Sequence, residues 1–348
     1  MHLTNTADTK IENFSEKIFP AIGTGTMLWV PKNADEKEQL FQTYQYCLDR
    51  GYNFFDTAEI YGNGRCESLL GEFMKRDGRP VRISSKFAPP SSMNPIAPKR
   101  RAVDTKSPLA VSEALDGSLS RLGIPCLELY LMHTPPKNGN ISAYMGIMAE
   151  EVRKGRIRNI GVCNFSANQI IEAAESLKQH GLSLSAAMTG YNILRRYPET
   201  NGLFDVCKKY EITVIPYAPL AEGTLTGKYR GKRVPVNYFV TSYFGHLNIT
   251  KERDDDVPFL KRLFSKPREC DTRRMEPLMI ELESIAKANN KTIAQTAINW
   301  LITNPEVPVF PIPGMRNISQ TKDNLEAAEW RMTAEERKRI NDAELQCR

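Results

Sequence analysis

Four side chains in the first 133 residues of the sequence are of the types that reduction of a carbonyl group requires: Asp56, Tyr61, Lys86 and His133. Hydride transfer to a carbonyl carbon leaves negative charge on the oxygen, which then needs a proton. A tyrosine can donate that proton, but its ordinary pKa of about 10 is high for acid–base work at neutral pH. A nearby lysine ammonium would lower that pKa, a carboxylate would hold the lysine, and a histidine would orient the carbonyl group.

The positions of these residues favour a shared role. Asp56, Lys86 and His133 each end an apolar run that predicts a β-strand, and Tyr61 lies in the loop just after Asp56. Any one of them alone would more often be an ordinary structural residue. Because the parallel strands of a strand–helix barrel end at one cavity, their joint placement predicts a catalytic site.

Predicted strands and amphipathic helices alternate along the whole chain. Strands are predicted at residues 22–27, 53–57, 81–87, 127–133, 158–163, 185–191, 212–217 and 307–312. Helices are predicted at residues 35–50, 66–76, 107–122, 141–154, 167–179, 199–210, 275–289, 292–303, 317–328 and 333–345. Strands separated by helices of this length pair in parallel through right-handed crossovers.

Eight such strands predict an α/β protein with a (β/α)8 TIM barrel, long loops at its C-terminal face and extra C-terminal helices. Residues 1–348 are expected to form this single domain. An open doubly wound sheet is the structural alternative, and the lack of a GxGxxG motif after the first strand disfavours it.

Two stretches interrupt the alternation. Residues 88–106 are rich in proline and basic residues, and the basic triplet at 99–101 is interpreted as a solvated loop. Residues 227–274 are long and charged, and an aromatic segment from Tyr238 to His246 could form a lid or simply cover the barrel. Both stretches follow strands, so both are expected at the face that carries the active site.

Composition restricts the class of protein. The apolar fraction is 41% and the charged fraction 25%, as in globular proteins, and the net charge of +6 suits an anionic cofactor better than nucleic acid. No apolar run resembles a signal peptide or is long enough to span a bilayer. Seven cysteines without paired spacing and four scattered histidines predict reduced thiols, a cytoplasmic location and no metal site.

Six separated motifs resemble those of the aldo-keto reductases, in the order that the family has them. They are 56–62 with 67–71, Lys86 after its strand, LYLMHTP around His133, 161–165, 215–228, and 311–316 with Gln320 and Asn324. The resemblance implies reduction of an aldehyde or ketone to an alcohol with NADPH, with Asp56, Tyr61, Lys86 and His133 as the catalytic residues. The partner is then a small carbonyl substrate, and a monomer is favoured.

The same resemblance assigns the residues that would bind NADP. They are Thr26, Met27, Asp56, Cys163, Asn164, Met188, Tyr217, Pro219, Leu220, Gly223, Leu225, Lys228, Gly314, Arg316, Gln320 and Asn324. Among these, Asn164 would hold the nicotinamide carboxamide and Tyr217 would stack on the ring. Arg316 precedes a predicted helix start and could pair bidentately with a 2′-phosphate, which favours NADPH over NADH.

Three positions depart from the family pattern. Met188 stands where a glutamine is usual, Cys163 replaces a serine, and Ala218 replaces another serine. Methionine cannot give the amide hydrogen bonds of glutamine, so Asn164 could be the only side chain that anchors the carboxamide. We therefore hypothesise loose binding of the nicotinamide.

The substrate is less constrained than the chemistry. Trp29, Tyr61 and His133 are expected to contact it, with Trp29 as an aromatic wall. The pattern is most similar to the plant and fungal branch, which includes pyridoxal reductases, so pyridoxal is a candidate. The alternatives are a weakly catalytic regulatory subunit like the potassium-channel β-subunits, or a secondary-metabolism aldo-keto reductase with an atypical reaction.

Overall fold

The computed structural model describes residues 21–89, 110–136, 140–236 and 268–348. The basic triplet at 99–101, the predicted helix start at 107–109 and the aromatic segment Tyr238 to His246 lie outside these ranges.

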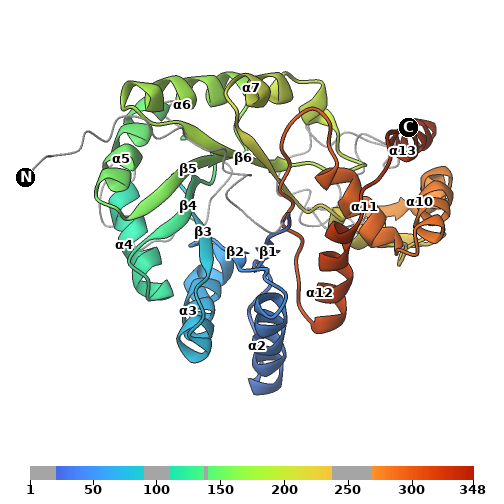
Figure 1. Ribbon diagram of the computed structural model, residues 1–348, viewed down its shortest axis with the longest axis horizontal. Coiled ribbons are helices and arrows are strands. Elements are labelled where there is room, and N and C mark those ends of the chain that lie inside the picture. Colours follow the sequence, from blue (N-terminus) through green and yellow to red (C-terminus); the bar gives the residue numbers. More distant parts are fainter. Residues whose placement is uncertain (1–20, 90–109, 137–139, 237–267) are drawn as a thin grey trace, which may run out of the picture.

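Seven parallel strands form one curled sheet in which strand order follows chain order (Figure 1). The strands are β1 Thr24–Gly25, β2 Phe54–Asp56, β3 Arg82–Phe87, β4 Leu127–Met132, β5 Ile157–Cys163, β6 Leu184–Gly190 and β7 Thr213–Tyr217. Each lies within or next to a predicted strand, so the predicted α/β class with a parallel sheet is confirmed. The carboxyl ends of all seven strands meet at one edge of the sheet.

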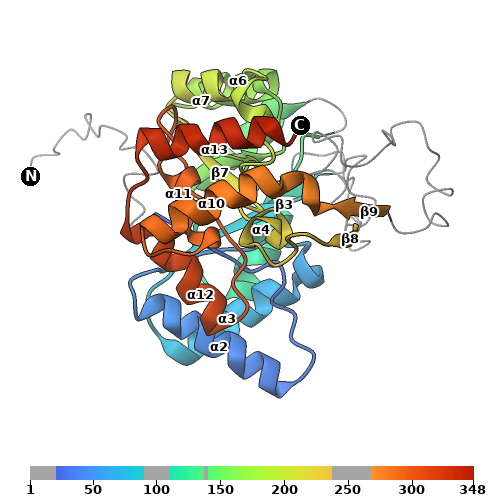
Figure 2. The same ribbon diagram turned by 90° about the vertical axis from the view of Figure 1, so that its right-hand side faces the viewer.

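Helices follow the strands and surround the outer side of the sheet (Figure 1). They are α2 Ala34–Leu48, α3 Arg65–Asp77, α4 Ala110–Leu122, α5 Ile141–Arg153, α6 Ala167–Gln179 and α7 Leu203–Lys209, then α10 Glu276–Ala288, α11 Ile293–Ile302, α12 Ile318–Leu325 and α13 Ala334–Gln346. Capping boxes at Ser166, Thr292 and Thr333 start three of them. The chain ends in α13, which packs against α10 (Figure 2).

The helix predicted at 199–210 is shorter than expected. A 3-10 turn at Tyr197–Glu199 precedes it, and α7 begins only at Leu203. Gly202 separates the two because its φ of 82° is left-handed, which an α-helix cannot continue through.

Apolar side chains form two layers. A large cluster fills the space between the sheet and the helices. A smaller one lies within the curl of the sheet and consists of Phe54, Leu129, Leu131, Cys163, Ala186, Met188, Ile215, Phe310 and Ile312, with Tyr217 packed against it. Side chains alternate between the two faces of a strand, so the residues that share the inner layer recur at every second position.

The eighth strand predicted at 307–312 is not a continuous strand. The segment makes isolated bridges from Val309 to Val214 and from Gly314 to Gly25. Its backbone bonds both edge strands, since Phe310 donates to Val214 at 2.9 Å and Gly23 donates to the carbonyl of Pro311 at 3.0 Å. Prolines at 308, 311 and 313 have no N–H group, which prevents a regular ladder.

The excursion at 227–274 contains an antiparallel pair that the sequence did not predict. Strand β8 Arg233–Val236 pairs with β9 Arg268–Asp271, beyond the end of α10 (Figure 2).

Candidate active site

An ion pair lies at the carboxyl ends of β2 and β3. The Nζ of Lys86 is 2.6 Å from Oδ2 of Asp56 and donates to the carbonyl of Thr57 at 2.7 Å. Ser84 lies two residues before Lys86 on the same face of β3 and donates to the other carboxylate oxygen at 2.5 Å. The Lys86 ammonium is also 3.3 Å from the hydroxyl of Tyr61. Asp56, Lys86 and Tyr61, which the sequence analysis expected at one site, are thus in contact through the Lys86 ammonium.

The turn after β2 delivers Tyr61 to this position. Tyr61 starts a 3-10 turn in which Gly62 and Asn63 adopt left-handed φ angles of 57° and 58°. Its ring lies edge-on to the ring of His133, with centroids 5.9 Å apart and an interplanar angle of 81°. Both rings are partly exposed, whereas Asp56 and Lys86 are buried. The groups that can pass or polarise a proton therefore face outward, and the ion pair lies beneath them.

Burial dominates the titration of Tyr61. It raises the pKa of the phenol to about 12, against the opposing pull of the Lys86 ammonium. The sequence-based expectation that the lysine would lower this pKa below its ordinary value is wrong in net direction. Burial also works against the charge on Lys86, but Asp56 outweighs it and raises the pKa of the ammonium. At neutral pH the site therefore contains a protonated phenol beside a fixed positive charge.

His133 is neutral at physiological pH. Burial, assisted by the charge of Lys86, lowers the pKa of its imidazole to about 3. Its backbone N–H extends the β3–β4 pairing by donating to the carbonyl of Phe87 at 2.8 Å. Within the described part of the chain, no protein group bonds its Nδ1. A neutral imidazole can orient a carbonyl group through its N–H without competing with Tyr61 as the acid.

The ends of β5 to β7 are built from neutral groups. Asn164 follows β5 with a left-handed φ of 62°. Its amide donates to the carbonyl of His133 at 3.1 Å and to the Sγ of Cys163 at 3.2 Å, and it accepts from the hydroxyl of Tyr217 at 2.9 Å. Met188 is buried beside them, at the inner face of β6. Asn164 thus links the proton-donating side of the site to Tyr217.

The segment after β7 winds through several left-handed residues. Ala218, Ala221 and Gly223 have φ angles of 49°, 48° and 92°. A methyl group added to Gly223 would lie 2.5 Å from the Lys228 ammonium, so the lysine covers the glycine closely. Of the other predicted contacts here, Leu220 is partly exposed, while Pro219 is buried and Leu225 is wholly buried in the core.

The start of α12 presents polar groups at the surface. Asn317 caps the helix by accepting from the backbone of Gln320 at 2.9 Å, and Gln320 accepts from the backbone of Arg316 at 3.2 Å. Asn324, which is buried, donates to the carbonyl of Gly314 at 3.3 Å. The side chains of Arg316 and Gln320 are exposed and line a cavity of about 290 Å³ between α12 and α2.

The family comparison agrees with this arrangement. The family model described as the aldo/keto reductase family matches residues 21–344. The chain belongs to the aldo/keto reductase family. Membership confirms the resemblance that the motifs predicted, and with it the assignment as an oxidoreductase of the NADP-dependent class.

Individual relatives extend along most of the chain. Chloroplastic pyridoxal reductase of Arabidopsis thaliana is 28% identical over 342 residues, which cover 92% of this chain and 82% of that protein. The aldo-keto reductase yakc [NADP(+)] of Schizosaccharomyces pombe is 29% identical over 333 residues, which cover 93% of this chain and 88% of that protein. A solved thermostable aldo-keto reductase in complex with epalrestat superposes with a TM-score of 0.65 at 26% identity, over 93% of this chain and 95% of that one.

One predicted substrate contact is wrong. Trp29 is wholly buried: its indole N–H donates to the carbonyl of Met315 at 2.7 Å, and its ring packs against Phe55 and Phe73. It has no surface to offer a substrate. Of its neighbours predicted to touch the cofactor, Thr26 is buried and bonds the carbonyl of Asp56, whereas Met27 is 53% exposed.

The sequence reasoning missed three polar residues at the site. Ser84 could have been found, since it shares a strand face with Lys86. Asn192 is buried and donates to the carbonyl of Ala218 at 3.0 Å, which fixes the segment after β7. Arg195 reaches the end of β6 from a loop, and no local pattern in the sequence indicates that direction.

Over the described ranges, the helices are too short or too polar to cross a membrane. In the same ranges, no three His, Cys, Asp or Glu side chains gather closely enough to hold a metal ion.

Proposed function

We propose that this protein reduces an aldehyde or ketone to an alcohol with NADPH, as a single-domain (β/α)8 barrel in which residues 307–314 take the place of the eighth strand. The observation that carries the proposal is the contact of Lys86 with both the Asp56 carboxylate and the Tyr61 hydroxyl, at 2.6 and 3.3 Å. These residues form a proton donor, a fixed cation and its anchor at one point of the sheet edge.

The protonation state of each side chain at neutral pH determines the role that we assign to it. Reduced nicotinamide, when bound, supplies the hydride. Tyr61 donates its proton to the carbonyl oxygen of the substrate, and Lys86 stabilises the phenolate that this leaves. Asp56 holds the ammonium in place, and neutral His133 orients the carbonyl through its N–H. Because burial raises the pKa of Tyr61 to about 12, the phenol remains loaded with its proton at neutral pH.

The residues present suit NADPH at the ring and at the phosphates. The partly exposed ring of Tyr217, tethered through its hydroxyl to Asn164, suits stacking on the nicotinamide. Lys228 beside Gly223 and Arg316 at the start of α12 bring positive charge where phosphates would lie. Free N–H groups at a helix start and a guanidinium both favour a 2′-phosphate, which supports NADPH over NADH.

An aromatic aldehyde is the substrate class that we propose, with pyridoxal as the first to test. The support is the likeness to a relative named pyridoxal reductase and to fungal aldo-keto reductases. Tyr61 and His133 would contact the carbonyl end.

The test starts with titration of the purified protein with NADPH and with NADH, followed by nicotinamide and tryptophan fluorescence. We expect tighter binding of NADPH, and Arg316→Leu should remove the preference while Lys322→Met, within α12, should not. A panel of carbonyl compounds beginning with pyridoxal then measures turnover. Failure to bind either nucleotide would contradict the proposal, and tight binding without turnover of any carbonyl would favour a regulatory role.

A further inference from the structure

Arg195 reaches the end of β6 from the loop that follows this strand. Gly190 is the last residue of β6 and pairs in register with Tyr217. A methyl group added to Gly190 would lie 2.5 Å from Nη1 and 2.7 Å from Cζ of Arg195. The guanidinium carbon is 5.9 Å from the ring centroid of Tyr217 and 5.1 Å from that of Tyr197. The glycine therefore leaves the space that the guanidinium occupies.

The direction of that space follows from strand geometry. Met188 and Gly190 are two residues apart on β6, so their side-chain positions face the same side of the sheet. Met188 belongs to the apolar cluster within the curl, against which Tyr217 packs. The Arg195 guanidinium thus lies on the inner side of the sheet, one layer above Met188 and beside the ring that would stack on a nicotinamide.

This part of the site has few other N–H donors for a carboxamide oxygen. Asn164 uses its two N–H groups on the carbonyl of His133 and the sulfur of Cys163. Met188 has no N–H group, and a thiol such as that of Cys163 is only a weak donor. Burial also raises the pKa of Cys163 to about 12, so its sulfur is neutral at physiological pH.

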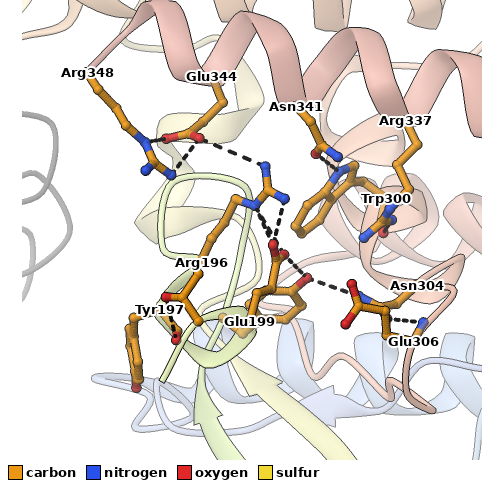
Figure 3. Close-up of polar contacts among 12 residues, drawn as sticks. Arg196, Tyr197, Glu199, Trp300, Asn304, Glu306, Arg337, Asn341, Glu344 and Arg348 are labelled. Carbon is orange, nitrogen blue, oxygen red and sulfur yellow. Dashed lines mark hydrogen bonds and ion pairs between the residues drawn. The ribbon is translucent and has the colours of Figure 1, made fainter. Parts of the chain in front are cut away.

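Ion pairs of the neighbouring Arg196 hold the loop that carries Arg195 (Figure 3). The next residue, Arg196, binds Glu199 at 2.6 Å and lies 3.9 Å from Glu344 on α13. Glu199 also accepts from the hydroxyl of Tyr191 at 2.6 Å. Because these contacts fix the backbone on both sides of Arg195, little order is lost when its guanidinium meets a ligand.

We propose that Arg195 donates a hydrogen bond to the carboxamide oxygen of bound NADPH, as a cofactor-positioning residue. The inference rests on the proposed function, because it requires a nicotinamide beside Tyr217. A planar guanidinium at this point supplies the donor that Met188 cannot, and it does so from a loop instead of from the strand.

The first test compares the dissociation constants of NADPH and of 2′,5′-ADP, which has the adenosine phosphates but no nicotinamide. Arg195→Met should weaken NADPH binding about tenfold, as expected for loss of one charged hydrogen bond, and should leave 2′,5′-ADP binding unchanged. Arg158→Met, which removes an equal charge at an exposed position near the start of β5, is the control. Unchanged NADPH binding, or equal weakening of both ligands, would overturn the inference.

A second variant tests the position without removing the arginine. Gly190→Ala should displace the guanidinium, because the new methyl group would collide with the end of a flexible side chain. We expect it to weaken NADPH binding as Arg195→Met does, and to add nothing when combined with that variant. Additive losses would mean that the glycine acts independently of Arg195.

The two proposals fail differently. A wild-type protein that binds no NADPH contradicts the proposed function itself. A wild-type protein that binds NADPH, with Arg195→Met folded by its melting temperature and binding equally well, contradicts only the role of Arg195.

Discussion

The two sides of the site at the sheet edge differ in where their charge comes from. At the ends of β2 and β3, Lys86 and Asp56 are strand residues that pair with each other in the core. At the ends of β5 and β6, the strands supply only the neutral Cys163 and Met188, and the positive charge comes from a loop. The first side is fixed by strand register and the second by loop packing.

The strand-borne side is the one that would transfer the proton, and the side supplied by a loop is the one that would bind the cofactor. A proton must be transferred over a short, fixed distance, so the donor and its cation gain most from rigid strands. A contact that only binds the cofactor needs to stabilise the bound nucleotide. A hydrogen bond that does so can come from several positions, including a loop. All four residues of the proton-donating side match the family pattern, whereas the three departures, Cys163, Met188 and Ala218, lie on the other side.

Removing the proton donor should have the largest effect. Tyr61→Phe should lower kcat by about a hundredfold to ten-thousandfold, the usual share of a general acid. The Lys86–Asp56 pair does not depend on the lost hydroxyl, so NADPH affinity should stay within about twofold, a shift well under 1 kcal/mol. Turnover with a saturating carbonyl substrate measures the effect, and Tyr210→Phe, far from the site, is the control. Full activity in Tyr61→Phe would refute the assignment.

Breaking the ion pair should affect stability as well as turnover. Lys86→Met leaves the Asp56 carboxylate buried without its cation, which should cost about 3–5 kcal/mol in the free energy of unfolding. Chemical denaturation measures this loss. Adding Asp56→Asn to the same chain should restore much of the stability and none of the activity. If the single variant were as stable as wild type, the pair would not be as buried as we describe.

The sequence predicted the strand-borne side well because strand ends can be recognised locally. An apolar run followed by Asp56, Lys86 or His133 gives both the element and the edge at which its side chain lies. The pattern of the first seven strands was predictable for the same reason. The eighth strand was predicted as continuous because its residues form an apolar run. Three prolines lie in that run or directly after it, and they lack the N–H groups that a regular ladder needs.

Residues whose direction depends on distant packing were not predictable. Trp29 follows a strand and is aromatic, as a pocket wall would be, but its N–H is satisfied by Met315, which is far away in the sequence. Arg195 occupies space that Gly190 leaves open, and its neighbour Arg196 lies 3.9 Å from Glu344 on α13, so its direction depends on residues outside its own loop. The net pKa shift of Tyr61 likewise depends on how much surrounding structure excludes water, which one sequence motif does not reveal.

The imidazole on the proton-donating side should make the protein sensitive to acid. Its pKa is about 3 in the folded protein, so between that value and its ordinary pKa of about 6.5 only the unfolded chain binds the proton. Stability should therefore fall with decreasing pH, by about 1.4 kcal/mol per pH unit for one proton. The free energy of unfolding of wild type and of His133→Gln should be compared from about pH 6.5 to about pH 5, which is above the range in which most carboxylates titrate. The difference between the two proteins then reports the contribution of His133. Parallel stability curves would show that His133 can be charged in the folded state.

Introducing an amide at Met188, near the end of β6, should have the smallest effect on cofactor binding, and the size of that effect depends on Arg195. Met188→Gln adds a donor at the inner face of β6, so NADPH should bind about three- to fivefold more tightly, and Met188→Leu should change little. If Arg195 already serves the carboxamide, the gain from glutamine should be larger when Arg195→Met is present, because the two donors then no longer share one acceptor. Affinity that is unchanged or weaker in Met188→Gln would argue against loose nicotinamide binding. Equal gains in both backgrounds would mean that glutamine and arginine contact different parts of the cofactor.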